Sequence, residues 1–124
     1  MLIPKTFTEF LLSEGRPLAE INPGSDEYAL KPLVALKALD LLSGSQVAVL
    51  GGDVLKDEIG KLTYTYENWY CERLPKEDPL HYVNRSQMVA REFINALVRK
   101  NNETLYVVLG FSELGIVNVQ GSRD

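Results

Sequence analysis

Two carboxylates in the middle of this 124-residue chain, Asp53 and Glu67, are of the residue type needed for acid–base catalysis. Such a pair is the equipment of a small hydrolase or isomerase. Cys71 and the single histidine, His81, form a second candidate pair, for nucleophilic catalysis. However, the Glu72 carboxylate beside Cys71 disfavours a reactive thiolate, and 17 acidic residues supply carboxylate pairs by chance. We therefore expect no enzymatic activity, and the paired-carboxylate enzyme is kept as an alternative.

No motif for a bound nucleotide or metal accompanies these residues. The chain lacks a phosphate-binding glycine loop and a G-x-S-x-G nucleophile motif. One histidine and one cysteine do not make up a zinc site. We expect no cofactor and no metal.

The same stretch is better suited to binding a protein. Residues 64–72 contain three tyrosines and a tryptophan, the types most enriched at binding hot spots, beside two glutamates. Gly51 and Gly52 interrupt a strand pattern, which indicates a bulge that either lets Asp53 bond nearby N–H groups or turns it outward. Trp69 can alternatively be a core anchor. The predicted partner-binding residues are Asp53, Glu67, Trp69, Tyr70 and Glu72.

Hydrophobic periodicity predicts the elements that position these side chains. Helices are predicted at residues 6–12 and 33–42. A third helix is predicted to begin at Asn84, which forms a capping-box pattern with Gln87, and to end at Asn101. Strands are predicted at 46–56, 61–73, 105–111 and 116–120, the last two joined by a turn at 112–115. We expect one α+β domain over residues 1–124, with about three helices on a mainly antiparallel sheet of about four strands.

The first two strands are predicted to form a long hairpin around a turn at residues 57–60. The expected register pairs Lys56 with Lys61 and Asp53 with Tyr64. This register brings the predicted contact residues together on one hairpin. The apolar run 105–109 is a candidate sheet edge that pairs with a second copy, so a homodimer or homo-oligomeric scaffold is a further alternative.

Charge and cysteine content narrow the class of protein. Lys and Arg total 13 against 17 Asp and Glu, a net charge of -4, which is opposite in sign to a general nucleic-acid binder. The acidic excess is concentrated in residues 51–80 and suits a basic protein partner. The lone Cys71 and the absence of a signal-peptide pattern favour the cytoplasm. No apolar run reaches the roughly 20 residues of a membrane-spanning helix.

Several short motifs follow one another at characteristic spacing. They are residues 38–42, residues 51–54, Gly60, residues 65–69 with Glu72, and then Tyr82, Arg85 and Ser86. In these motifs the chain resembles, over about residues 35–100, the bacterial polymorphic-toxin immunity proteins of the family called immunity protein forty.

The resemblance implies a small cytoplasmic α+β protein, encoded beside a secreted toxin, that binds the toxin and has no chemistry of its own. If the toxin is a nuclease, its phosphate-binding site is basic. An acidic inhibitor surface would then compete for that site and accelerate association. The expected partner is therefore a cognate toxin, with no nucleic acid and no membrane.

Overall fold

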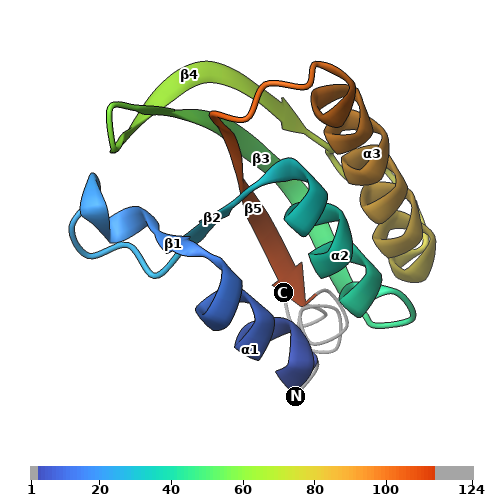
Figure 1. Cartoon of the computed structure of the whole chain (residues 1–124). Coiled ribbons are helices and arrows are strands. Elements are labelled where there is room, and N and C mark those ends of the chain that lie inside the picture. Colours follow the sequence, from blue (N-terminus) through green and yellow to red (C-terminus); the bar gives the residue numbers. More distant parts are fainter. Residues whose placement is uncertain (1–2, 114–124) are drawn as a thin grey trace.

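The computed structural model describes residues 3–113, which form three α-helices and a five-stranded antiparallel sheet (Figure 1). The α+β class is thus confirmed. The strand count exceeds the expected four because two strands of two and three residues are too short to show a hydrophobic alternation. The elements are α1 (Lys5–Glu14), β1 (Arg16–Pro17), the 3-10 helix η1 (Leu18–Glu20), β2 (Tyr28–Leu30), α2 (Pro32–Leu42), β3 (Val47–Glu58), β4 (Lys61–Tyr70), α3 (Pro79–Arg99) and β5 (Leu105–Glu113).

Helices α1 and α2 form where the periodicity predicts them, but α3 begins earlier than expected. It starts at Pro79 rather than Asn84, because the Asp78 carboxylate accepts hydrogen bonds from two backbone N–H groups of the first turn. Gln87, the second residue of the expected capping box, instead donates from Nε2 to the carbonyl of Val47 at 2.8 Å. Gln87 therefore joins α3 to the sheet and does not cap the helix.

The strand order is β1-β2-β5-β3-β4, which places β5 inside the sheet. The run 105–109 pairs with β2 on one side and β3 on the other, so the expectation of a sheet edge there was wrong. The predicted turn at 112–115 is also wrong at its start, since β5 continues to Glu113. The predicted strand at 116–120 lies outside the described residues. Strand β4, which pairs with β3, forms one edge of the sheet.

The β3–β4 hairpin is confirmed, but its register differs from the expected one. Lys61 pairs with Glu58 instead of Lys56. The turn consists of only Ile59 and Gly60, which have φ of 52° and 84°. Positive φ at both central residues is the type I′ turn, whose twist matches that of the flanking strands. The two-residue turn therefore replaces the longer one expected at 57–60.

Ile59 is a poor residue for this turn, and replacing it is expected to stabilise the protein. A β-branched side chain at positive φ is strained, and the Ile59 side chain is fully exposed. Asparagine tolerates this conformation, and Asn-Gly is the preferred type I′ pair. We expect Ile59→Asn to raise the free energy of unfolding by about 1 kcal/mol, measured by urea denaturation. An unchanged or lower value would contradict a strained turn.

A bulge in β4 then shifts the register a second time. Tyr66 has φ of 70°, and the Thr65 hydroxyl donates to a β3 carbonyl at 2.8 Å, so the ladder is interrupted. Beyond the bulge, Asp53 lies opposite Asn68 instead of Tyr64. The bulge expected at the glycine pair is a separate one in β3 itself, where the register against β5 shifts between Val49 and Gly51.

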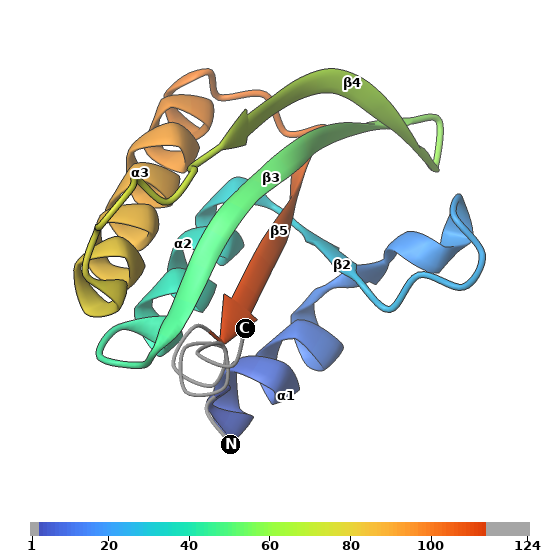
Figure 2. The same ribbon diagram turned by 180° about the vertical axis from the view of Figure 1, so that it is seen from behind.

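The two faces of the sheet are covered differently. All three α-helices pack on one face, over a core that includes Phe7, Leu39, Ile94 and Val107 (Figure 1). On the other face η1 shields a smaller apolar cluster that includes Val108. Figure 2 shows β3 passing in front of α2, with α3 to its side and no described helix over this side of β3. This second face, which we call the open face, is therefore partly exposed.

Candidate functional site

A hollow of about 280 Å³ lies on the open face, across β3, β4 and β5. Gly51 of β3 lies directly opposite Gly110 of β5 and Tyr70 of β4. Residues directly opposite each other in antiparallel strands point to the same face. This row therefore has two positions without a side chain beside one aromatic ring. A Cβ at Gly51 would meet the backbone of β4, whereas one at Gly110 would make a single contact of 3.7 Å, so it is the missing side chain of Gly110 that leaves the sheet surface hollow at this point.

Acidic residues surround the hollow. Asp53 projects from β3, and Glu27, just before β2, reaches the hollow from the other side. A second hollow of about 350 Å³ shares Glu27 and Gly110 with the first and also contacts Asp26. We call the two adjoining hollows the open-face groove. Backbone contacts of Glu27 hold it in place, since its carbonyl accepts from Leu18 N–H at 2.9 Å.

The carboxylates of the open-face groove carry uncompensated charge. Within residues 3–113, the side chains of Asp26, Glu27 and Asp53 form no ion pair or hydrogen bond, whereas Asp57 and Asp40 are paired with arginines. Partial burial, followed by the charges of Asp53 and Asp26, raises the pKa of Glu27 above its ordinary value. The groove is therefore an acidic surface without an internal counterion in the described part of the chain.

The structure places two of the five predicted contact residues, Asp53 and Tyr70, at this groove with their side chains on the open face. Tyr70 is 72% exposed. Glu67 lies at the β4 bulge, where it pairs with Lys100, just past α3, at 3.5 Å. Glu67 does not line the groove, so Asp53 and Glu67 are not brought together as the acid–base pair of the enzyme alternative.

Trp69 borders the hollow, but its ring lies on the helix-covered side. The indole stacks on Phe93 of α3 with ring centroids 4.6 Å apart. A Cβ added at Gly52, directly opposite on β3, would lie 2.4 Å from this ring. The Trp69 Nε1 is buried and has no hydrogen-bond partner among the described residues. The ring therefore packs between α3 and the sheet.

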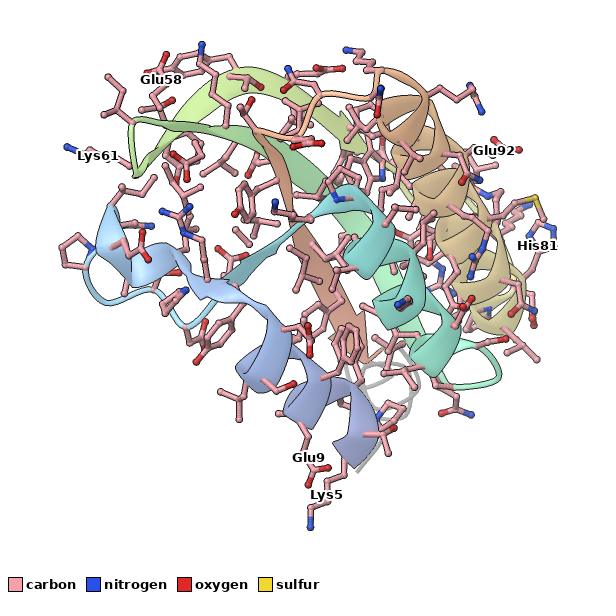
Figure 3. All side chains as sticks on the ribbon, in the orientation of Figure 1. Lys5, Glu9, Glu58, Lys61, His81 and Glu92 are labelled. Carbon is pink, nitrogen blue, oxygen red and sulfur yellow. The ribbon has the colours of Figure 1, made fainter. Side chains whose placement is uncertain are left out.

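Cys71 and Glu72 lie just after β4, and His81, which completes the second candidate catalytic pair with Cys71, lies in α3. The Glu72 carbonyl accepts from Arg85 at 2.8 Å, and Glu72 lies outside the open-face groove. Arg85 also contacts the Cys71 sulfur at 3.3 Å, whereas His81 Nδ1 lies 2.7 Å from Glu77. Hydrogen bonds from Arg85 hold the pKa of Glu77 well below its ordinary value. Cys71 and His81 thus have separate partners, and His81 projects outward from α3 (Figure 3).

Three residues of the groove were not predicted from the sequence. Asp26 and Glu27 belong to a loop that had no predicted element, although the carboxylates come directly before an apolar Tyr-Ala-Leu triplet. Gly110 stands alone inside an apolar strand pattern. An isolated strand glycine indicates a bulge or a close approach, and this signal could have drawn attention to it.

The model of the family immunity protein 40 matches residues 17–111, which include every residue of the first hollow. The chain belongs to this family. Membership in the immunity protein 40 family implies an immunity protein directed against a toxin. Comparisons with curated proteins and with solved structures give no match.

Two structural features are absent from the described residues of this immunity protein. None of the helices within residues 3–113 has the apolar stretch that a membrane-spanning helix requires. The same residues contain no group of three or more His, Cys, Asp or Glu side chains arranged to hold a metal ion.

Proposed function

We propose that this immunity protein 40 member neutralises its cognate toxin in the cytoplasm by binding it through the open-face groove, as a single domain without chemistry of its own. The observation that carries the proposal is the set of three carboxylates, unpaired among the described residues, that line the two adjoining hollows of the open-face groove. Unpaired charges at a rim favour association with a surface of opposite charge. Asp53 and Tyr70 are the predicted contact residues that this proposal retains at the groove.

The charge of the groove also supports a class of toxin. A nuclease must bind phosphates and therefore presents a basic active site. The chain has a net charge of -4, and the groove gathers acids with no cationic partner in the described residues. We therefore propose that the toxin is a nuclease and that the groove binds its basic surface. Electrostatic attraction of this kind accelerates encounter and disfavours acidic partners.

The proposal is tested by expressing this chain together with the product of the adjacent reading frame. We expect host growth to be rescued and the two proteins to purify as a stable complex. Host growth with an unrelated folded protein in place of this chain is the matched control. A folded chain that neither rescues growth nor purifies with the product would contradict the proposal.

Titration of the purified toxin then separates binding from catalysis. Nucleic-acid cleavage is expected to stop when the immunity protein reaches an amount equimolar with the toxin, because each molecule of a contact inhibitor blocks one molecule of toxin. Complete protection at a small fraction of that amount would indicate turnover. That outcome would favour the hydrolase or isomerase alternative.

A further inference from the structure

The protein already contains one arginine site on the same face of the sheet. The Arg16 guanidinium donates to Asp57 of β3 at 2.7 Å and to Glu20 at 2.9 Å. It also lies over the ring of Tyr106 of β5, 5.2 Å from the centroid. An aspartate of β3, a glutamate from the chain leading to β2 and a tyrosine ring on the sheet together hold this guanidinium.

The hollow repeats this arrangement without an arginine of its own. Asp53 lies on β3 four residues before Asp57, so both carboxylates project from the open face. Glu27, before β2, supplies the second carboxylate, and it lines the same hollow as Asp53. Tyr70, at the edge of the hollow, supplies an exposed aromatic ring. The three residue types of the Arg16 site are thus present again.

The shape of the hollow suits a long side chain with a planar charged end. The row of Gly51 and Gly110 leaves the sheet backbone bare, so an aliphatic stem can lie across it. A guanidinium can donate to carboxylates through several N–H groups and stack on an aromatic ring. An ammonium is a compact charge that lacks the planar face. Arginine therefore fits better than lysine.

We propose that the hollow binds one arginine side chain of the toxin, with its guanidinium at Asp53, Glu27 and Tyr70 and its stem over Gly51 and Gly110. This inference rests on the proposed function, since it names the group of the toxin that the groove recognises.

The test uses the intact chain and N-acetyl-L-arginine amide as the probe, so it does not require the toxin. Titration at low salt is followed by two-dimensional amide NMR. We expect saturable shifts concentrated at Gly51, Gly110 and Asp53. The lysine amide is expected to bind several-fold more weakly, and the uncharged citrulline amide, which has the same shape, is expected to cause no such shifts.

Three variants separate charge from shape. Asp53→Asn is expected to weaken arginine-amide binding about tenfold, because a charge-assisted contact is lost. Gly110→Val is expected to abolish binding by filling the hollow, since a Cβ at Gly110 meets only the Gly51 carbonyl oxygen at 3.7 Å and causes no clash. Glu92→Gln removes an exposed carboxylate on α3 and is expected to leave binding unchanged. Unfolding curves check that each variant is folded.

Equal shifts with arginine and citrulline amides, or undiminished binding to folded Gly110→Val, would overturn the arginine site. So would shifts spread evenly over the surface. Growth rescue and co-purification with the toxin do not depend on that result, so the proposed function can hold even when the arginine site is rejected. Conversely, specific binding of the probe without toxin rescue would keep a guanidinium site and reject the neutralising role.

Discussion

Replacing Asp53 and Glu27 together by lysine is expected to slow association with the toxin roughly 10–100-fold at low salt. Both carboxylates lie at the rim of the hollow and have no side-chain partner in the described residues, so their reversal removes no internal ion pair. The reversal replaces attraction of a basic surface by repulsion. The measurement is the association rate from stopped-flow mixing, with circular dichroism to confirm the fold.

The salt dependence of this effect identifies its origin. Screening shortens the range of the field to about 10 Å at 0.1 M salt. The difference in rate between the original chain and the double variant is therefore expected to shrink as salt is added. A difference that persists unchanged at high salt would point to lost packing instead of electrostatics.

A second pair of reversals controls for net charge. Glu92 projects from the outer side of α3 (Figure 3), and Glu103 lines a different hollow between α2 and α3. Glu92→Lys with Glu103→Lys changes the net charge equally but leaves the open-face groove intact, so only a small effect is expected. Glu72→Lys, also outside the groove, is expected to behave similarly. Equal slowing by the control pair would exclude the groove as the docking surface.

Replacing Gly51 by alanine is expected to destabilise the protein by about 3 kcal/mol, the upper part of the usual range for overpacking. A Cβ at this position would lie 2.2 Å from the carbonyl oxygen of Trp69 and 3.0 Å from the Cα of Tyr70. Both atoms belong to the backbone of the paired strand, so neither can move aside without disturbing the ladder. The floor of the hollow would be distorted as well.

Gly110→Ala is the matched comparison, because Gly110 lies directly opposite Gly51. An added Cβ there makes only one contact of ordinary length, so we expect stability to be unchanged or raised by up to about 1 kcal/mol. Urea unfolding can be followed by the fluorescence of Trp69, the only tryptophan in the chain. Similar unfolding midpoints for the two variants would show that the close approach at Gly51 is not a constraint.

Local patterns were sufficient for most of the elements. The apolar run before Ser43 predicts α2, and the alternation after Gly60 predicts β4, because burial of one face imposes its period on neighbouring residues. The start of α3 was missed because Asp78 and Asn84 are both acceptable capping residues. Only the folded chain shows which of the two side chains reaches the free N–H groups.

The hairpin register illustrates a different limit. Isoleucine is an unusual residue at positive φ, so the residue type at Ile59 does not reveal the two-residue turn. Tyr66 is equally unusual in the bulge. The turn at Ile59 and the bulge at Tyr66 both lack the residue types that favour positive φ. Together they move Asp53 from its expected partner, Tyr64, to Asn68.

By itself, the sequence determined the α+β class, the acidic excess, the aromatic hairpin and the resemblance to an immunity protein family. These properties depend on composition and on residues close together in the chain. The tertiary structure alone decided that Glu27, Asp53, Tyr70 and Gly110 form one groove and that Glu67 and Glu72 lie outside it. The groove depends on β5 pairing between β2 and β3, and such long-range pairing is set by the packing of the whole sheet, which leaves no period in the local sequence.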